Sequence, residues 1–282
     1  MERADKPIFE GYALVTDMDG TLLDKQKEIS PDNLAAIHRF VSEGGRFTVA
    51  TGRIVEPAGY FARQLPVNLP AILYNGAMIY DYEREEPLHQ TLLPRAAEQA
   101  LQRVLEAFPE IGAEIYVQGE PYPYTIRDNA MTARHRGIEN FPLQAVDEVK
   151  SIPADWLKIL FAWEPVLLDQ ASDEMVRLSS GTGVEWVRSD GRYFEMLPQG
   201  ATKGDALEQL LALTGLELDK CVAMGDHLND LEMIRRAGMG VAVGNAHPLL
   251  LEAADHVCKS HTEHAVADVI GWLEQRIRSE RP

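Results

Sequence analysis

Long apolar runs are missing from this chain of 282 residues, which has no stretch near the roughly 20 apolar residues that a membrane-spanning helix needs. The first residues, MERADKPIFEGY, carry charges where an export signal would need an apolar segment. With 45% hydrophobic and 25% charged residues, the composition is typical of a globular protein. We therefore expect a cytoplasmic protein that does not interact with membranes.

Cysteine is also scarce. Only Cys221 and Cys258 occur, and their spacing matches neither a zinc site nor a disulfide framework. Both lie in apolar, strand-like surroundings, KCVAMG and DHVCKS. This context predicts two buried free thiols.

Basic residues are too few for a protein that binds nucleic acid in general. The chain has 27 Lys and Arg against 44 Asp and Glu, a formal net charge of -17, whereas such binding depends on basic patches that neutralise phosphates. Small phosphorylated molecules are not excluded. A metal ion, a lysine and backbone amides can hold a small anion locally within an acidic protein.

Short apolar stretches alternate with helical patterns at both ends of the chain. YALVT stops at the polar DMDGT, FTVAT stops at Thr51, and AILYNGA stops near Asn75. Between the first two strands, Ser30 and Pro31 mark the start of a helix. The inner face of that helix is expected to contain Leu34, Ile37, His38 and Val41.

The same alternation resumes at Thr202, with a helix through KGDALEQLLALTG, a strand CVAMG, a helix LNDLEMIRRAG, a strand GVAVG and a final helix from about Thr262. Strands that alternate with helices predict a parallel sheet with right-handed crossovers and helices on both faces. The fold class is therefore α/β, a doubly wound, Rossmann-like parallel-sheet core. A region with its own strand and helix patterns interrupts it, as expected of an inserted α+β domain. The predicted boundaries are 1–84 and 191–282 for the core and 85–190 for the insertion.

Two carboxylates follow the first strand directly. Asp17 and Asp19 are two residues apart in extended backbone, so both can face one site, and ligands of parallel sheets bind at the ends of the strands. A DxD pair alone can equally be explained by turns and helix caps. Here Thr51 and Asp226 also follow strands of the same sheet, and Lys203 begins a helix. A carboxylate that attacks a phosphate faces like-charge repulsion, so such a site requires a divalent cation and fixed donors, and these residues are the right kinds of group for that requirement.

Five strings in this order resemble the haloacid dehalogenase (HAD) superfamily of hydrolases, in particular its Cof-type phosphatases with an α/β cap. They are DMDGTLLD from Asp17, ATGR from Ala50, NGA from Asn75, KGDAL from Lys203 and GDHLNDLEM from Gly225. The match spans nearly the whole chain. The resemblance implies a phosphatase that acts on small phosphorylated metabolites, such as sugar phosphates, nucleotides or phosphorylated cofactors.

The resemblance also implies roles for individual residues. Asp17 would be the nucleophile that becomes phosphorylated, and Asp19 the acid and then the base. Mg²⁺ would be bound by the side chains of Asp17 and Asp226 and by the backbone carbonyl of Asp19. Lys203 would neutralise charge on the nucleophile and the phosphoryl group. The remaining roles implied are phosphate or substrate contacts for Thr51, Gly52, Asn75 and Asn229, and orientation of the metal shell or the lysine for Asp230.

Other interpretations stay open. A phosphomutase shares this core, a receiver-like signalling module shares its clustered aspartates, and a catalytically silent binding protein could share its fold. A histidine metal site from His227, His261 and His264 is conceivable, although magnesium prefers oxygen ligands. The physiological substrate and the oligomeric state, monomer or small homo-oligomer, are not determined. Aromatic and basic residues of the insertion could recognise the substrate or simply belong to its core and surface: Tyr116, Tyr122, Tyr124, Arg127, Arg134, His135 and Arg136.

Overall fold

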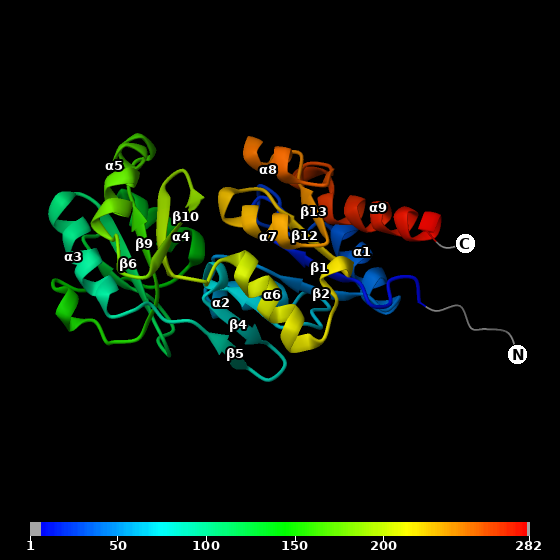
Figure 1. The fold of residues 1–282 in the computed structure, drawn as a ribbon, viewed down its shortest axis with the longest axis horizontal. Coiled ribbons are helices and arrows are strands. Elements are labelled where there is room, and N and C mark those ends of the chain that lie inside the picture. Colours follow the sequence, from blue (N-terminus) through cyan, green and yellow to red (C-terminus); the bar gives the residue numbers. More distant parts are fainter. Residues whose placement is uncertain (1–6, 281–282) are drawn as a thin grey trace, which may run out of the picture.

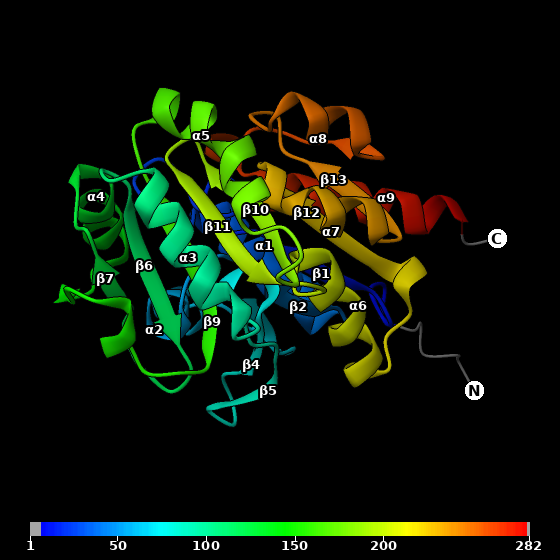
Figure 2. The same cartoon turned by 60° about the vertical axis from the view of Figure 1, so that its left-hand side comes forward.

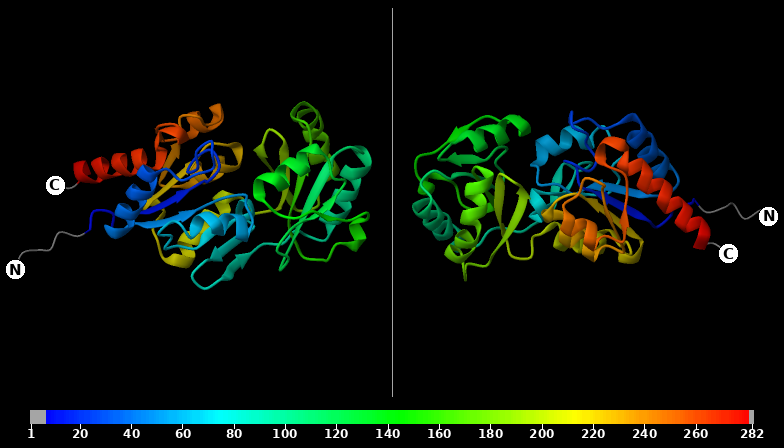
Figure 3. Two further views of the ribbon diagram at one scale, coloured as in Figure 1. Left: turned by 180° about the vertical axis from the view of Figure 1, so that it is seen from behind. Right: turned by 90° about the horizontal axis from the view of Figure 1, so that it is seen from above.

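The structure is a computed structural model that describes residues 7–280. It consists of a core and a cap that lie side by side (Figure 1). The N-terminal and C-terminal segments of the chain both belong to the core, and the middle segment forms the cap. Figure 3 shows the same division from behind and from above.

A parallel five-stranded sheet forms the centre of the core, in the order β14-β13-β12-β1-β2. All four strand pairs are parallel, and β1 lies between the strands contributed by the two segments. This arrangement confirms the predicted sheet. The strands are β1 (Ala13–Thr16), β2 (Arg46–Val49), β12 (Cys221–Gly225), β13 (Met239–Ala242) and β14 (His256–Val257).

Helices cover both faces of this sheet, as the predicted doubly wound fold requires. One apolar cluster joins Leu14 and Val222 to α1 and α9, and another joins Val15 and Ala223 to α6. Strand alternation sends neighbouring side chains to opposite faces, which explains why β1 contributes to both clusters. The core helices are α1 (Pro31–Ser42), α2 (Val55–Ala62), α6 (Lys203–Thr214), α7 (Leu231–Arg236), α8 (Pro248–Ala253) and α9 (Ala265–Glu280).

Helix α1 begins as predicted, and three of its four predicted inner residues, Leu34, Ile37 and Val41, pack against the core. Ser30 accepts a hydrogen bond from the amide of Asn33, and Pro31 occupies the first helical position. Asn33, Ile37 and Phe40 are the buried residues of the helix, whereas the predicted His38 is exposed. The polar Asn33 can be buried because its side-chain oxygen accepts from the amide of Ala267 in α9.

The third predicted strand is shorter than expected. In the described part of the chain, β3 (Ala71–Leu73) meets the parallel sheet through a single bridge, between Ala50 and Ile72. The chain then turns through η1 (Tyr74–Gly76) into an antiparallel sheet of β3, β4 (Met78–Asp81) and β5 (Glu86–Gln90). Asn75 lies in this turn with a positive φ of 58°, a conformation that asparagine tolerates better than most residues.

The cap contains a six-stranded sheet in the order β10-β11-β9-β6-β7-β8. Figure 2 shows α3 and α5 in front of this sheet, and their buried side chains form a separate apolar cluster with it. The strands are β6 (Gly112–Val117), β7 (Tyr124–Ile126), β8 (Gln144–Ala145), β9 (Trp156–Ala162), β10 (Val184–Asp190) and β11 (Tyr193–Pro198). The helices are α3 (Ala96–Ala107), α4 (Ala130–Glu139) and α5 (Pro165–Leu178).

Strand pairing bears on where the cap begins and ends. β5 lies inside the predicted insertion, 85–190, yet it pairs with β4 of the core. β11 lies beyond the insertion, yet it pairs with β9 and β10 of the cap. We therefore propose that the cap extends from about residue 91 to about residue 198.

Short 3₁₀ helices connect several elements: η2 (Val149–Ser151), η3 (Leu218–Lys220), η4 (Leu228–Asp230) and η5 (His261–Glu263). Cys221 and Cys258 are buried free thiols, as predicted. Within residues 7–280, no helix combines the length and the apolar character needed to cross a membrane. The cytoplasmic location stays a prediction.

Replacing Gly76 with alanine is expected to destabilise the core. Gly76 has a φ of +117°, and an added Cβ would collide with the backbone carbonyl of Thr202, at the start of α6. We expect Gly76→Ala to lower the free energy of unfolding by about 1–3 kcal/mol, measured by urea denaturation. The control is Gly271→Ala in α9, where nothing lies within 4 Å and alanine should stabilise the helix by up to about 1 kcal/mol. Equal unfolding midpoints for the two variants would contradict this account.

Candidate active site

The predicted site residues converge at the carboxyl ends of the core strands. Asp17 follows β1, Thr51 lies just beyond β2, Asp226 follows β12 and Lys203 begins α6. A cavity of about 410 Å³ opens there between core and cap, and three of these four residues, with Asp19, line it. Its size lies toward the lower end of the roughly 300–1,000 Å³ typical of small-molecule sites.

The loop after β1 brings Asp17 and Asp226 close together. The amide of Asp17 donates to the carbonyl of Met224 in β12 (2.9 Å), and the hydroxyl of Thr21 donates to Asp226 Oδ1 (3.2 Å). Gly20 has a φ of +87°, and a Cβ on it would collide with the Asp226 carboxylate. Glycine is therefore required here both by the backbone conformation and by the close approach of the second aspartate.

Lys203 binds the carboxylate of Asp17, the candidate nucleophile. Thr202 caps α6 through a reciprocal pair of hydrogen bonds with Asp205, which fixes the first turn of the helix. The Lys203 side chain is fully buried, and its Nζ lies 2.6 Å from Asp17 Oδ1 and 2.6 Å from Asp230 Oδ1. Burial alone would lower the pKa of Lys203, but these carboxylates raise it above its usual value, so the ammonium group stays charged.

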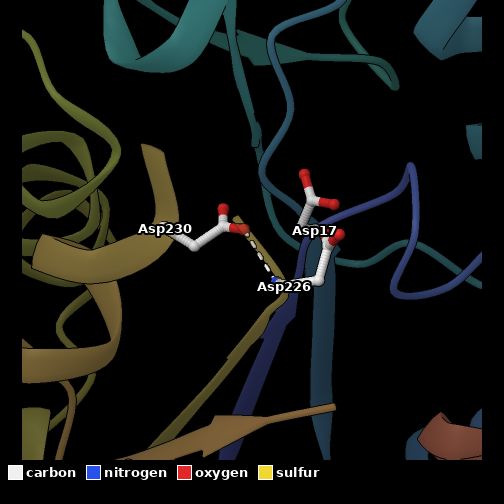
Figure 4. A group of neighbouring side chains, drawn as sticks. All are labelled: Asp17, Asp226 and Asp230. Atoms are coloured by element: carbon white, nitrogen blue, oxygen red, sulfur yellow. Dashed lines mark hydrogen bonds between the residues drawn. The ribbon is translucent and has the colours of Figure 1, made fainter. Parts of the chain in front are cut away.

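Asp230 uses both of its oxygens within the protein. Oδ1 accepts from Lys203, and Oδ2 accepts from the backbone amides of Asp226 (3.0 Å) and His227 (3.1 Å). Figure 4 shows the hydrogen bond to Asp226 and the opposing carboxylates of Asp17 and Asp226. Asp230 therefore positions the lysine and the Asp226 loop rather than offering a free ligand atom.

The electrostatics of this group fit a bound cation. Burial, which outweighs the attraction of Lys203, raises the pKa of Asp17 to about 7, and burial together with the charge of Asp17 raises that of Asp226 to about 8. Oxygens of Asp17, Asp226 and Asp230 lie within 4.8 Å of one another. Within residues 7–280, this is the one group of three or more Asp, Glu, His or Cys residues whose possible metal-ligand atoms lie that close together. One ammonium cannot neutralise three carboxylates, so a cation bound by oxygen atoms would complete the charge balance.

Asp19 is held in a different environment. Its carboxylate accepts a bidentate pair from Arg53 (2.7 and 2.8 Å) and a further bond from Lys27 (2.6 Å). Burial alone would raise the pKa of Asp19, but Arg53 and Lys27 hold it well below its usual range. Asp19 is therefore ionised in this arrangement.

The phosphate-contact candidates lie together around the loop after β2. The hydroxyl of Thr51, which is buried, accepts from the amide of Arg53 (3.2 Å), and its own proton has no assigned acceptor among the described residues. Asn229 Nδ2 donates to Asn75 Oδ1 (3.0 Å), while Asn75 Nδ2 and Asn229 Oδ1 are buried and have no partner within residues 7–280. An added Cβ at Gly52 would lie 2.9 Å from Asn75 Nδ2, so the loop and this amide pair are closely packed.

Comparison with known proteins agrees with this geometry. A family model of haloacid dehalogenase-like hydrolases matches residues 14–270. YxeH of Bacillus subtilis, provisionally named a phosphatase, is 32% identical over 275 residues, covering 93% of this chain and 98% of YxeH. The chain belongs to the haloacid dehalogenase-like hydrolases. The predicted family, the fold class and the enzyme class, a phosphatase, are confirmed.

Two further relatives extend the comparison. The HMP-PP phosphatase of Serratia proteamaculans is 30% identical to this hydrolase over 243 residues, covering 83% of this chain and 84% of the relative. A solved haloacid dehalogenase-like hydrolase from Bacteroides thetaiotaomicron superimposes with a TM-score of 0.79 at 27% identity, covering 93% of this chain and 99% of the other. A receiver-like module is not supported, because the family model spans core and cap together.

The three histidines do not form a metal site in this hydrolase. His227 Nδ1 bonds the carbonyl of Arg188, His261 Nδ1 bonds that of Leu23, and His264 Nδ1 bonds the hydroxyl of Ser30. Arg188 lies in β10 of the cap, whereas Leu23 and Ser30 lie in the segment between β1 and α1 of the core. The acidic group described above is the one that could hold a metal within residues 7–280.

Of the aromatic and basic residues noted in the insertion, Tyr116 and His135 line the cavity of the hydrolase. The other five residues do not line it within the described chain. Arg136, for example, pairs with Asp128 at 3.0 Å, and Arg127 donates to the backbone carbonyls of Leu105 and Phe108 at the C-terminal end of α3.

Sequence reasoning missed the charged side chains that the cap presents to the cavity. Glu114, Lys158 and Glu195 are buried in central strands of the cap sheet, and Lys158 and Glu195 line the cavity with Arg53 and Glu139. The signal is present in the sequence: each of these strands has one charged residue within an otherwise apolar run, as in WLKILFA. A charge at such a position needs a buried partner.

Magnesium is expected to stabilise this hydrolase more at about pH 8 than at about pH 5.5. The raised pKa values of Asp17 and Asp226 mean that the metal-free folded state holds protons that the unfolded state, with pKa values near 3.8, has lost. Stability without metal should therefore fall as the pH rises from 4 toward 8. A cation that replaces those protons should bind more tightly at the higher pH.

Thermal unfolding in EDTA and in excess Mg²⁺ at both pH values measures this effect. The increase in unfolding temperature caused by Mg²⁺ should be larger at the higher pH. In Asp226→Asn, which keeps the size of the side chain but removes its charge, the increase should nearly disappear. An increase that does not change with pH, or that persists in this variant, would argue against a cation between Asp17 and Asp226.

Proposed function

We propose that this hydrolase cleaves phosphate monoesters of small metabolites in a magnesium-dependent reaction, through an aspartyl phosphate on Asp17. The observation that carries the proposal is the position of Asp17 in the cavity. One of its oxygens is bound to Lys203, and the other has no hydrogen-bond partner among the described residues. This leaves a fixed carboxylate with a free oxygen facing the space where a substrate would lie.

The charges of the proposed site suit a dianionic substrate. A bound Mg²⁺ would be held by Asp17, Asp226 and the backbone carbonyl of Asp19, and it supplies positive charge that lowers the repulsion between carboxylate and phosphate. Lys203 keeps Asp17 oriented and, together with the cation, favours its ionised form against the effect of burial. Thr51 and the unpartnered amide of Asn75 can donate hydrogen bonds to phosphoryl oxygens.

In the first step, Asp17 Oδ2 attacks phosphorus and the bond from phosphorus to the ester oxygen breaks. Asp19 gives its proton to the departing oxygen. In the second step, Asp19 takes a proton from water, the water oxygen attacks phosphorus, and inorganic phosphate and free Asp17 are released. Arg53 and Lys27 favour the ionised form of Asp19, which suits the second step. For the first step these two cations have to release Asp19 so that it can carry a proton.

The names of the relatives support phosphatase chemistry without identifying a substrate. YxeH is provisionally named a phosphatase, and the Serratia proteamaculans relative is named for its action on HMP-PP. Both cover more than four fifths of this chain. We therefore propose small phosphorylated metabolites as the substrate class. No specific observation favours a phosphomutase over a phosphatase.

Asp17→Asn is expected to reduce hydrolysis of p-nitrophenyl phosphate to background, because an amide cannot form the phospho-enzyme. Wild-type turnover should require Mg²⁺ and stop in EDTA. Asp173→Asn, at an exposed position of α5, is the matched control and should keep wild-type turnover. Circular dichroism should give the same spectrum for all three proteins. Full activity in Asp17→Asn would remove Asp17 from the role of nucleophile.

Asp19→Asn is expected to discriminate between leaving groups. An alkyl phosphate needs a proton on its departing oxygen, and general acid catalysis typically contributes about 10²- to 10⁴-fold. p-Nitrophenolate leaves without that help, so only the hydrolysis of the aspartyl phosphate should then be slowed. The ratio of kcat/KM for an alkyl phosphate to that for p-nitrophenyl phosphate should therefore fall in the variant. An unchanged ratio would refute the acid role of Asp19.

A further inference from the structure

One lysine of the cap reaches the loop after β2 in the core. Lys158 lies in β9, where it is buried and is the one charged residue of the strand WLKILFA. Its Nζ lies 2.6 Å from Glu195 Oε2 in the neighbouring strand β11, and it donates to the carbonyl of Gly52 (2.9 Å), 106 residues earlier in the chain. Glu195 already neutralises the charge of Lys158 within the cap, so the bond to Gly52 is an additional contact that joins cap and core.

The core holds the residues on either side of Gly52 through its own backbone. Three hydrogen bonds join them to the segment 72–75: the amide of Thr51 donates to the carbonyl of Ile72 (2.8 Å), the amide of Asn75 donates to the carbonyl of Thr51 (3.0 Å), and the amide of Tyr74 donates to the carbonyl of Arg53 (3.1 Å). The carbonyl of Gly52 differs, because its donor is the side chain of Lys158 in the cap. The position of the cap therefore bears on the orientation of this carbonyl.

The carbonyl of Gly52 and the amide of Arg53 belong to one peptide unit, which is planar. The amide end of this unit donates to the hydroxyl oxygen of Thr51 (3.2 Å). A donor that fixes the carbonyl end therefore also fixes the direction of the amide, and hydrogen bonds linked in this way strengthen one another. Because the Thr51 oxygen accepts from the amide, its own proton is free to donate to another group. Thr51 lines the cavity, so that group can be a bound phosphate.

We infer that Lys158 is a positioning residue of the cap, which orients the Gly52–Arg53 peptide unit so that the hydroxyl of Thr51 donates to a phosphoryl oxygen. The inference rests on the proposed function, in which Thr51 contacts the phosphoryl group. In this role Lys158 acts through the backbone of the core and not through the leaving group of the substrate. Because the lysine belongs to the cap, the oriented hydroxyl depends on the cap lying on the core, as it does in this structure.

The variant that tests this inference replaces the buried ion pair as a unit. Lys158→Met alone would leave Glu195 buried without a counter-ion, so it is combined with Glu195→Gln, because removing both charges costs far less stability than removing one. The net charge of the protein then stays the same. Lys150→Met, at an exposed position of the cap, is the matched control. Circular dichroism and thermal unfolding establish that each variant is folded.

Inorganic phosphate is the probe, because it has no leaving group for the cap to recognise and its binding requires no turnover. Its dissociation constant is measured by calorimetry in the presence of Mg²⁺. We expect the double variant to bind phosphate about 10-fold more weakly than the wild type, since a hydrogen bond to a charged group is lost. Glu195→Gln, which keeps the lysine, and Lys150→Met should change the affinity by less than about twofold. An unchanged affinity in the double variant, or an equal loss in Glu195→Gln, would overturn the inference.

A cycle with Thr51→Val shows whether Lys158 acts through the hydroxyl. Valine nearly keeps the shape of the side chain but has no proton to donate. In the Thr51→Val background, the change of Lys158 and Glu195 should alter the affinity for phosphate by less than about twofold, because the group that the lysine orients is already absent. A lysine that only stabilised the cap would give the same fold-change in both backgrounds, and that result would contradict the inference.

These measurements separate the two proposals. Magnesium-dependent turnover of p-nitrophenyl phosphate, together with phosphate affinities that do not respond to the loss of Lys158, would overturn the inference about the cap alone. No turnover of any phosphate ester in the presence of Mg²⁺ would overturn the proposed function and, with it, the inference that depends on it.

Discussion

The rest of the site depends on the two ion pairs that the buried ammonium group of Lys203 makes with Asp17 and Asp230. The ammonium group joins Asp17, 186 residues earlier in the chain, to Asp230 in the loop after β12. Asp230 in turn holds the backbone amide of Asp226. A single charge therefore fixes the geometry of three aspartates from two segments of the chain. Their combined negative charge exceeds what one lysine can neutralise, which makes the site a receptor for further positive charge.

Much of the core could be predicted because its signals are local. Each central strand is a short apolar run that stops at a polar residue, so the ends of β1 and β12 identify Asp17 and Asp226 without knowledge of their partners. Asp230 was expected within a helix that begins at LND, whereas it lies in a 3₁₀ turn before α7, where it accepts from the backbone amide of Asp226. The predicted inner face of α1 was less accurate, because Asn33 is buried by a hydrogen bond to α9 that no periodicity reveals.

The cap was harder to predict because its important contacts join distant strands and both domains. Alternation shows that Glu114 and Lys158 lie on a face different from that of Ile115 and Ile159, but it does not show what this face meets. The pairing of β5 with β4 and of β11 with β9 is likewise absent from the local pattern. Arg53 belongs to a recognised string, yet its bond to Asp19 depends on how two loops pack at the end of the sheet.

The core and the cap differ in how their buried charges are balanced, and the loop of residues 51–53 contacts both. The core gathers excess negative charge that suits a cation and a phosphate, whereas the inner face of the cap pairs its charges internally. Residues 51–53 contact both parts: Lys158 of the cap donates to the carbonyl of Gly52, and Arg53 binds Asp19 while its Nη1 lies 3.4 Å from Glu139 of α4. Thr51, the proposed phosphate contact, lies in the same loop. A shift of the cap that moved Lys158 or Glu139 would therefore act on the proposed phosphate contact and on Asp19 together. The position of the cap is in this way coupled to the position of a proposed catalytic carboxylate.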